Sequence, residues 1–540
     1  NPSAPPVVVG VIDTGIDRHH SDLRPNLWVN AGEIPFNGID DDGNGKIDDV
    51  HGFDFVTNTG NVTDAGIHGT HVAGTLAAAG NNSLGVIGAN PRAKVMTLKV
   101  SSNGNDISSA AFVAAMDYAV DRKENGVNLV ALNASFAGPN FSTAEHAGIQ
   151  ALDQAGIILC TGAGNNGQSN DIFPLYPGNY RLPNMIVVAA SNQSDGLWTG
   201  SNHSPTKVDL AAPGANIYSS IPGAVVMSLK AGTSTYQVLA MQWAGTSEPV
   251  TGTIYDCGFG NPGDFPPGVS GNIALISRGQ IVQRQKALNA MAAGAKAAIV
   301  HDNVAGHFLG TLDVGGDWLP IGTITQANGN AIKALLPLTG TVTATQTAGD
   351  YISGTSMASP QVAAAVSLAA MNFPEDSMAQ RIARILDNVD DKPAFTNFTI
   401  TGGRLNLQRL LDSDANSLPD WWEKQFFNQY TGADPEGDRD GDGQSERDEF
   451  LAATSPVDPA SSLRSTSVTR SVGTGHFTVE WQSVPGKSYR VAYSGSLEGG
   501  WLRDLPASLV TGAAGQTTSY TDTTASPAGR RFYRVEVESP

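Results

Sequence analysis

Short apolar runs that alternate with helix-length segments constrain the fold of the first third of this chain more than any other feature. The runs have the length of buried strands and lie at residues 7–12, 94–100, 127–132, 156–159 and 185–190. The segments 108–121 and 142–155 between them begin with serine, a residue that caps helix N-termini. Strands that alternate with helices predict a parallel sheet with helices on both faces, and hence an α/β domain.

The rest of the chain changes character several times. Its 540 residues predict three or four domains. We expect an α/β domain in two parts, residues 1–222 and 348–411, the second part starting with a helix at 354–371. Residues 223–347 are rich in strand-forming residues, with a helical stretch at 280–293, and predict an α+β insertion. An acidic linker, 412–460, precedes an alternating segment, 461–540, that predicts an all-β sandwich.

Composition excludes several classes of protein. The net charge of −19 would repel nucleic acid, and the chain holds no apolar run long enough to span a membrane. Two cysteines, Cys160 and Cys257, exclude a disulfide scaffold. The N-terminus lacks a signal pattern, so either the protein is cytosolic or an export segment has been removed. We expect a monomer.

Three motifs carry reactive side chains: VIDTGID with Asp13, HGTHVAGT with His68 and GTSMASPQVAAA with Ser356. Nucleophilic cleavage of an acyl bond needs a hydroxyl, a base that takes its proton, and a carboxylate that orients the base. Ser356 is expected at a helix N-terminus, where free N–H groups favour negative charge. Pro360 is expected in the first turn of that helix, where a missing N–H costs little.

Together these motifs resemble those of the subtilisin-like serine proteases, the subtilases, in the order Asp, His, Ser already known for subtilisin. The resemblance implies that Asp13 is the carboxylate that orients the base, that His68 is the general base and that Ser356 is the nucleophile. His71 would be a structural neighbour of the base. The segment CTGAGNNGQ resembles the oxyanion loop of the family, which implies Asn165 as a donor. Asn166 is the rival assignment.

Resemblance also implies how a substrate would be held. An extended peptide would pair with two chain edges, one at residues 101–104 and one formed by Ser135, Phe136, Ala137 and Gly138. Phe136 and Ala137 are bulkier than the commoner family residues and are expected to narrow the groove. Leu175 stands where many relatives have glycine, so we expect a shallower pocket with less preference for very large side chains.

The insertion resembles a protease-associated domain over residues 271–303. That resemblance implies a domain beside the cleft, which either gates the access of large substrates or only stabilises the protein. The final segment resembles a fibronectin-type sandwich, whose Trp481, Tyr489, Trp501 and Tyr533 are expected in the core.

Carboxylate spacing predicts calcium sites. In the segment 40–49, oxygen side chains alternate around glycine turns, as a hard cation requires. The expected ligands are Asp40, Asp42, Asn44, the Lys46 carbonyl and Asp49, with Asp48 undecided and a solvated acidic turn as the alternative. By family resemblance alone, a second site would use Asp22, Asn82 and the carbonyls of Leu84 and Val86.

The acidic linker carries two further loops. One fits the EF-hand template at every oxygen position, and the other is a weaker copy without its glycine. Both resemble the calcium loops of thrombospondin type 3 repeats or dockerin-like linkers. The expected ligands are Asp438, Asp440, Asp442, Gln444 and Glu449 in the first, and Asp412, Asp414, Asn416 and Glu423 in the second.

These observations predict a secreted, calcium-bound serine endopeptidase whose pro-region has been removed. Its substrates would be proteins or peptides, with collagen and other structural proteins as one option and general protein digestion as the other. The alternative from another class is a calcium-dependent binding protein on an inactive protease scaffold.

Overall fold

The structure is a computed structural model. It describes residues 5–538 except 36, 105, 224, 313–317, 347, 486, 498, 499, 504, 506, 514–516 and 526–529. The chain divides into two compact units, residues 2–406 and residues 407–540. Among the described residues, every helix is too short or too polar to cross a bilayer.

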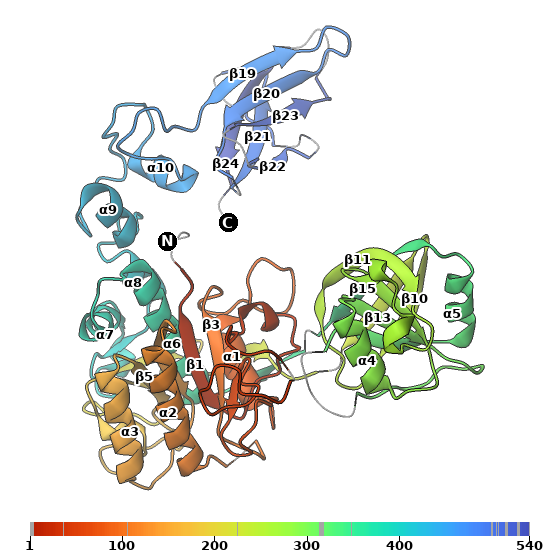
Figure 1. The fold of residues 1–540 in the computed structure, drawn as a ribbon. Helices are drawn as coiled ribbons and strands as arrows, with labels where there is room; N and C mark the ends of the chain where they lie inside the picture. Colours follow the sequence, from red (N-terminus) through yellow and green to blue (C-terminus); the bar gives the residue numbers. More distant parts are fainter. Residues whose placement is uncertain are drawn as a thin grey trace. The chain divides into compact units, whose positions relative to one another are not determined.

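A nine-stranded sheet forms the centre of the first unit (Figure 1). Its strands are, in spatial order, β17 (Asp390–Asp391), β18 (Gly403–Arg404), β7 (Leu210–Pro213), β6 (Met185–Ser191), β5 (Ile158–Gly162), β4 (Leu129–Ala134), β1 (Val8–Asp13), β3 (Lys94–Lys99) and β2 (Gly52–Asp54). All neighbours are parallel except β17 and β18. The predicted α/β fold is confirmed.

Helices cover both faces of this sheet. Helices α2 (Ser109–Glu124) and α3 (Thr143–Gln154) lie side by side (Figure 1), and their apolar side chains share a core with β1, β3 and β4. Ser108 and Ser142 cap them by accepting bonds from Ala111 N and Glu145 N. Helices α1 (His68–Ala77) and α6 (Thr355–Asn372) pack on each other and on the sheet, and α7 (Met378–Asp387) packs on α6.

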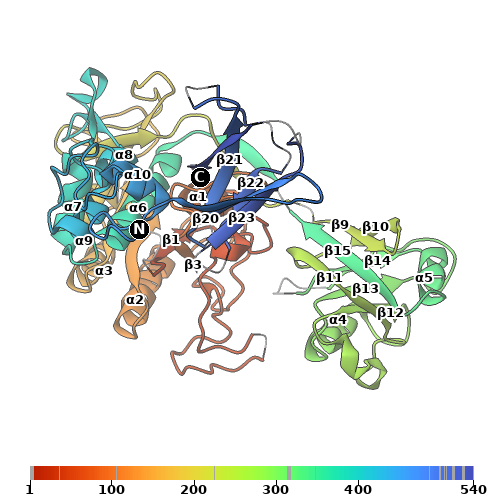
Figure 2. The ribbon, with the colours of Figure 1, turned by 90° about the horizontal axis from the view of Figure 1, so that it is seen from above.

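The inserted segment forms a closed barrel with helices around it (Figure 2). Its strands are β9 (Val226–Ala231), β10 (Ser234–Ala240), β11 (Ser247–Asp256), β12 (Ile273–Ser277), β13 (Ala297–His301), β14 (Ile321–Ile324) and β15 (Leu338–Thr345), and its helices are α4 (Gln283–Ala292) and α5 (Gln326–Lys333). Outside the barrel, β8 (Ile217–Ser220) and β16 (Gly349–Ile352) pair as an antiparallel ribbon. Cys160 in β5 and Cys257 after β11 are buried free thiols.

The second unit begins with α8 (Leu407–Leu411), α9 (Asp420–Phe427) and α10 (Glu446–Ala452). Two three-stranded sheets follow: β19 (Ser465–Arg470), β20 (Phe477–Gln482) and β23 (Thr517–Asp522), and β22 (Leu509–Thr511), β21 (Ser488–Ser494) and β24 (Phe532–Val537). Trp481 and Tyr489 are buried between them, as predicted for this β-rich region, whereas Trp501 and Tyr533 are half-buried. Single 3₁₀ turns lie at Arg24–Asn26, Gly178–Tyr180, Pro262–Asp264, Pro267–Val269 and Pro393–Phe395.

One prediction about α6 is wrong. Pro360 lies in the second turn, inside the helix, because α6 begins at Thr355. Proline has no N–H, so the carbonyl of Ser356 loses its usual helical donor. The hydroxyl of Ser135 donates to that carbonyl instead, over 2.9 Å.

Candidate active site

The three motif residues stand at the ends of elements that meet at one edge of the sheet. Asp13 is the last residue of β1, His68 the first residue of α1 and Ser356 the second residue of α6. Both helices pack against β1, so their N-termini face the carboxyl end of that strand. Asp13 is buried, Ser356 is nearly so, and the imidazole of His68 keeps 31% of its surface exposed.

Asp13 and His68 are in direct contact. Asp13 Oδ1 lies 2.8 Å from His68 Nδ1 and also accepts a bond from Thr14 N. Burial lowers the pKa of His68, but the charge and hydrogen bond of Asp13, together with the charge of Asp64, outweigh it and raise that pKa overall. Since Nδ1 bonds to the carboxylate, Nε2 is the ring nitrogen left to accept a proton.

The hydroxyl of Ser356 is turned toward Ser135, not His68. It donates to the carbonyl of Ser135 over 2.9 Å, while the Ser135 hydroxyl donates back to the carbonyl of Ser356. Below this pair, Asn133 donates to Ser135 Oγ and accepts from Ser359 Oγ. Catalytic hydrogen bonds often tighten only when substrate binds, and a rotation of one side chain would free this hydroxyl. The motifs gave no signal for Asn133 and Ser359.

Asn165 is oriented as an oxyanion donor. Its Oδ1 accepts bonds from Thr355 N and Thr355 Oγ1, at 2.9 and 3.0 Å, so the amide nitrogen is the group left to donate. Asn166 uses its backbone N–H to bind Asn202 Oδ1. This geometry favours Asn165 over Asn166, and both line a hollow with Ser356.

The same hollow, of about 430 Å³, includes the predicted substrate edge and Leu175. A side chain added to Gly164 would come within 2.4 Å of Leu175 Cδ1, so Leu175 fills the space beside that glycine. The N–H and C=O of Gly138 both bond to Tyr176, and the carbonyl of Ser135 accepts from Ser356 Oγ, so Phe136 and Ala137 are the residues of the predicted edge whose backbone is open among the described residues.

Phe136 lines the hollow and also packs into the core. Its ring packs edge to face on Phe112 of α2, with centroids 5.1 Å apart, and joins the core on that side of the sheet. His71 is also accounted for. Its Nε2 bonds to the carbonyls of Ile217 and Asp350, and burial lowers its pKa.

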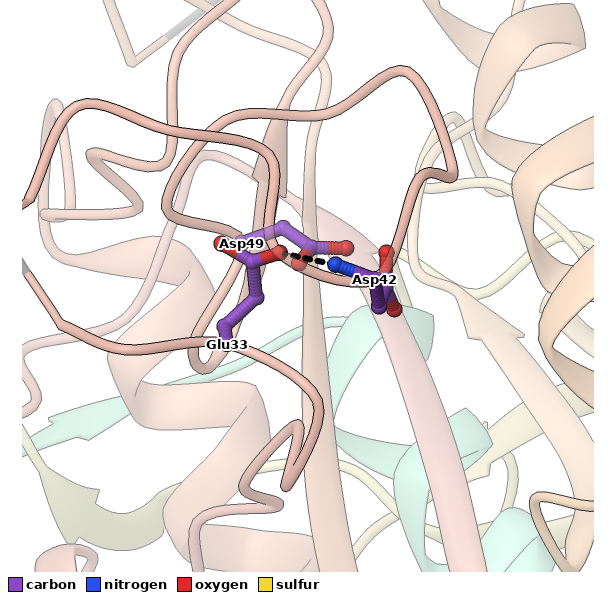
Figure 3. A group of neighbouring side chains, drawn as sticks. All are labelled: Glu33, Asp42 and Asp49. Atoms are coloured by element: carbon purple, nitrogen blue, oxygen red, sulfur yellow. Dashed lines mark hydrogen bonds between the residues drawn. The ribbon is translucent and has the colours of Figure 1, made fainter.

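The acidic loop after the 3₁₀ turn Arg24–Asn26 gathers three carboxylates, Glu33, Asp42 and Asp49, each with an oxygen within 4.8 Å of those of the others (Figure 3). Glu33 accepts the N–H groups of Asp41, Asp42 and Asp48 and so shapes the loop. The sequence gave no signal for it, because it lies outside the repeating segment.

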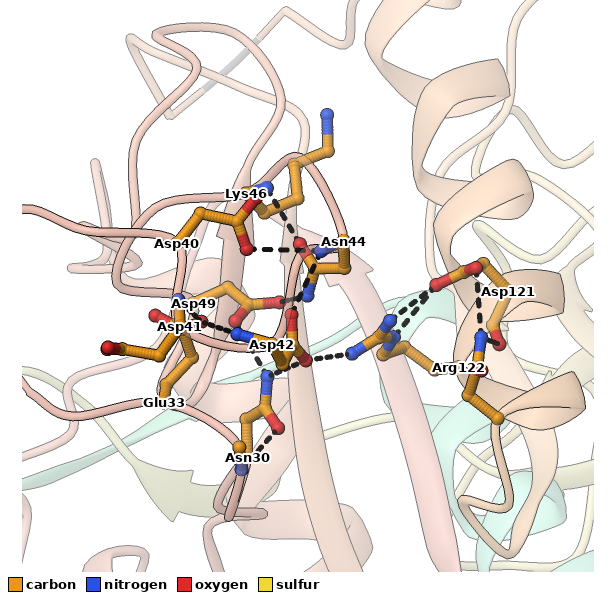
Figure 4. A network of polar contacts seen from close by, with 12 residues as sticks. Asn30, Glu33, Asp40, Asp41, Asp42, Asn44, Lys46, Asp49, Asp121 and Arg122 are labelled. Carbon is orange, nitrogen blue, oxygen red and sulfur yellow. Dashed lines mark hydrogen bonds and ion pairs between the residues drawn. The ribbon is translucent and has the colours of Figure 1, made fainter.

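The other predicted members of this loop have separate roles (Figure 4). Asp40 accepts the N–H groups of Asn44 and Gly45, and Lys46 N donates to Asn44 Oδ1. Asp48 turns outward, to the N–H groups of residues 37 and 38, which removes it from the ligand set. The remaining carboxylates are braced by neutral and cationic donors, including Arg122 on Asp42 and Tyr118 on Asp49.

The structure also brings together the members of the second predicted site. Asp22 is fully buried, and its two carboxylate oxygens accept from Asn82 Nδ2 and Val86 N. Asn82 Oδ1 accepts from Leu84 N. A cation here would therefore require the Asn82 amide to turn its oxygen toward Asp22, since oxygens bind calcium and N–H groups do not.

The loop before α10 fits a cation best. The carboxylates of Asp438, Asp440 and Asp442 lie close together, and Glu449 is fully buried. Both oxygens of Glu449 have no hydrogen-bond partner among the described residues, and the same holds for one oxygen each of Asp440 and Asp442. Burial and the neighbouring acids raise the pKa of Glu449 to about 8. Glu446, which also has a buried unpartnered oxygen, is a residue that the sequence template missed.

The loop before α9 is a partial copy of this arrangement. Asp412 accepts from the N–H groups of Asn416 and Ser417, and Asn416 Nδ2 contacts both Asp414 and Glu423. Glu423 is fully buried with one unpartnered oxygen. Gln444, the remaining expected ligand of the loop before α10, bonds through its side chain to the backbone of Leu463.

Comparisons with known proteins agree with the predicted fold class. Residues 5–248 match the subtilase family profile, and residues 246–332 match that of the PA domain. Subtilisin-like protease 1 of Plasmodium berghei is 35% identical over 242 residues, covering 42% of this chain and 39% of that protein. Subtilisin amylosacchariticus of Bacillus subtilis subsp. amylosacchariticus is 32% identical over 218 residues, covering 40% and 49%.

Among solved structures, the psychrophilic subtilisin-like protease Apa1 from the Antarctic psychrotroph Pseudoalteromonas sp. AS-11 is 26% identical. That match covers 76% of this chain and 93% of the other, with a TM-score of 0.41. The chain spans less than half the length of the curated relatives named above.

Proposed function

The chain belongs to the subtilase family of serine peptidases through residues 5–248, and on this premise we propose that it is a serine endopeptidase acting on proteins. The observation that carries the proposal is the 2.8 Å contact between Asp13 and His68, at the strand end faced by the helix that bears Ser356. A carboxylate that fixes the imidazole next to a serine is the arrangement that acyl transfer requires.

The proposed reaction proceeds in two halves. Ser356 Oγ attacks the peptide carbonyl while His68 Nε2 takes its proton, and Asp13 stabilises the resulting imidazolium. Asn165 Nδ2 and the Ser356 N–H bind the oxyanion. His68 then protonates the leaving amine, and water cleaves the acyl-enzyme by the same steps in reverse. The hydroxyl of Ser356 leaves its bond to Ser135 when it turns to His68.

Backbone pairing would hold the substrate. Phe136 and Ala137 make no backbone hydrogen bond among the described residues, so their N–H and C=O groups are available to an extended peptide. The segment 101–104 would form the opposite edge. Leu175 limits the adjoining pocket, which favours small and medium side chains. If replacing Leu175 by glycine left side-chain preference unchanged, this assignment would be abandoned.

We further propose Ca²⁺ as a resident ion of a secreted enzyme. The loop before α10 supports this most strongly, because buried carboxylate oxygens without partners are costly unless a cation neutralises them. Asp438, Asp440, Asp442 and Glu449 would hold the ion, which supplies charge neutralisation and a rigid loop. The cluster of Glu33, Asp42 and Asp49 is the second candidate. Calcium at millimolar concentration outside cells would fill such loops.

Labelling with an active-serine phosphonate tests the activity. The intact protein should gain one phosphonyl adduct, Ser356→Ala should gain none, and Ser234→Ala, an exposed serine in β10, should react like the parent protein. Failure of the parent to react, with and without calcium, would favour the alternative of a calcium-dependent binding protein.

Substrate range needs a separate comparison. Hydrolysis of casein and of insoluble collagen should be measured for the full chain and for residues 1–411. If the second unit assists digestion of structural proteins, the truncation loses activity on collagen and keeps activity on casein. Equal losses would assign no such role to it.

A further inference from the structure

The first turn of α1 is capped by residues from elsewhere in the chain. Ile67, the residue before the helix, offers no side-chain cap. Instead, Gly69 N donates to Thr14 Oγ1 over 3.0 Å, and Thr70 N donates to Asp64 Oδ2 over 2.9 Å. Unpaired N–H groups at a helix N-terminus must find such acceptors. The helix that starts with the proposed base is therefore fixed by the strand end and by the loop in front of it.

A single carboxylate joins these two caps. Asp64 Oδ1 accepts from Thr14 Oγ1 at 2.6 Å and from Gly66 N at 2.9 Å, while its Oδ2 also accepts from Thr70 Oγ1 at 2.5 Å. Thr14 directly follows Asp13, and Thr70 lies two residues after His68. Asp64 thus binds the residue next to Asp13 and the residue two positions after His68.

Backbone packing makes this junction stiff. A Cβ on Gly69 would come within 2.0 Å of Gly15 O, and a Cβ on Gly15 would come within 2.7 Å of the carbonyls of Val62 and Thr63. The loop also bonds along the strand end, through Ile16 N to Val62 O and Ala65 N to Thr14 O. Small movements of the loop would therefore be transmitted to the helix N-terminus.

Asp64 also places a negative charge near the imidazole. No lysine or arginine of the described residues forms an ion pair with it. The charged or titratable groups that act on His68 are Asp13 on β1, Asp64 in the loop and His71 in α1, whose own pKa is lowered by burial. Both carboxylates favour the protonated imidazole.

We propose that Asp64 is a positioning residue for the proteolytic reaction, because its carboxylate ties Thr14 to Thr70 and so holds Asp13 and His68 in contact. This inference rests on the proposed function. The negative charge of Asp64 adds a second effect, since it stabilises the imidazolium of His68 that forms when Ser356 is deprotonated. A residue that only capped α1 would have neither effect on His68.

Four variants separate these effects. Asp64→Asn removes the charge and disturbs the bonds. Thr14→Val removes the bonds to Asp64 and to Gly69 N and leaves the charge of Asp64, and Thr14→Ser keeps the hydroxyl. Thr75→Ala, in the same helix, removes a hydroxyl bond to His71 O without touching Asp64. Each is assayed for kcat and KM on a short chromogenic peptide from pH 5 to 9, together with its melting temperature.

We expect kcat to fall by about tenfold to a hundredfold in Asp64→Asn, the size expected for a misplacement of about 1 Å, with KM changed less than about twofold. The acidic limb of its pH profile should move to lower pH. Thr14→Val should lower kcat and move that limb less than Asp64→Asn does, since the charge of Asp64 remains, and Thr14→Ser should restore the parent behaviour. A loss in Asp64→Asn that Thr75→Ala reproduces at equal melting temperature, with the limb unmoved, would overturn the proposal.

A second measurement keeps the test independent of activity. In the Ser356→Ala background, the ring resonances of His68 are titrated by NMR with Asp64 or Asn at position 64. The proposal expects a lower His68 pKa and a weaker Nδ1–H signal in the Asn variant. An unchanged titration would overturn it, even if the parent protein cleaves peptides; a changed one would support it, even if the parent protein does not.

Discussion

The proposed nucleophile, Ser356, is held by Ser135 through its hydroxyl and its carbonyl. Ser356 donates to and accepts from Ser135, and the chain of bonds continues through Asn133 to Ser359, all in the buried space beneath α6. Pro360 explains the arrangement, since it removes the helical donor that Ser356 O would otherwise have.

Replacing Asn133 by alanine tests this network. It leaves two buried hydroxyls with fewer partners, each at a cost of about 1 kcal/mol or more, so the free energy of unfolding should fall by about 2 kcal/mol. Denaturant unfolding measures the change. The matched Asn125→Ala, at the exposed end of α2, should cost less than about 0.5 kcal/mol. Equal effects would contradict a special role for the buried amide.

The pH dependence follows from His68. Its pKa is raised, and only the neutral imidazole can accept the proton of Ser356, so kcat/KM should rise with pH through a midpoint above about 6.5. In Asp13→Asn the midpoint should drop and kcat should fall by about 10⁴, a magnitude known from another serine protease. A midpoint below 6 in the parent protein would contradict the assignment.

The Asp13–His68 contact also makes folding stability depend on pH, in the direction opposite to activity. Because the pKa of His68 is higher in the folded state, its contact with Asp13 stabilises the fold below the unfolded pKa of about 6.5. That contribution is lost as the pH rises through the folded-state pKa. The enzyme is therefore expected to be most active where this contact contributes least to stability.

At the scale of elements, the sequence predicted much of the sheet and its helices. Apolar runs mark buried strands directly, so the five predicted strands of the first domain overlap β1, β3, β4, β5 and β6, with ends that agree within three residues. The closure of the barrel could not be predicted from the sequence, because it depends on the pairing of β9 with β15, which are more than a hundred residues apart in the chain. Backbone pairing at that distance leaves no local pattern.

Those residues of the candidate site that lie within long sequence motifs could be predicted. Asp13, His68 and Ser356 are identified by their neighbours, whereas Glu33, Asp64 and Asn133 are single polar residues with ordinary surroundings in the sequence. Side-chain direction was also hidden: nothing local shows that Phe136 turns to Phe112 or that Asp48 turns outward.

The junction of β1 and α1 yields a prediction about Gly69. Alanine there would place a Cβ 2.0 Å from Gly15 O, so the helix must move away from the strand. We expect a loss of about 1–3 kcal/mol in unfolding free energy and a fall in kcat. Gly126→Ala, whose added Cβ meets no atom within 4 Å, has a positive φ and controls for backbone strain. A Gly69→Ala protein with parent-like stability would contradict the packing argument.

In the loop before α10, the effect of replacing Glu449 on the melting temperature should change sign when calcium is added. Glu449 is buried beside three other acids, so Glu449→Gln should raise the melting temperature of α10 and its loop in EDTA by removing charge repulsion. In millimolar calcium the same change should lower it, because a ligand is lost. Calorimetry with Glu436→Gln, an exposed acid, serves as the control. The same sign in both buffers would argue against a cation there.

At the scale of the whole molecule, the proposed chemistry lies in one compact unit and the best calcium loop in the other. A chain that ends at Asn406 should therefore keep kcat/KM for a short peptide within about threefold of the parent value. In the full chain, Glu449→Gln should likewise leave peptide hydrolysis unaffected. Loss of peptide hydrolysis on truncation would show that the second unit contributes to the reaction itself.

The ribbon of β8 and β16 gives the first unit an unusual entry point. Ser220 and Gly349 are register partners, so the chain leaves for the barrel and comes back through neighbouring strands, which lie about 5 Å apart in any sheet. Nearly a quarter of the polypeptide is thus inserted between two strands that a two-residue turn could connect. Another domain whose termini lie close together could replace the barrel at this position, so the ribbon offers an insertion site for chimaeric proteins.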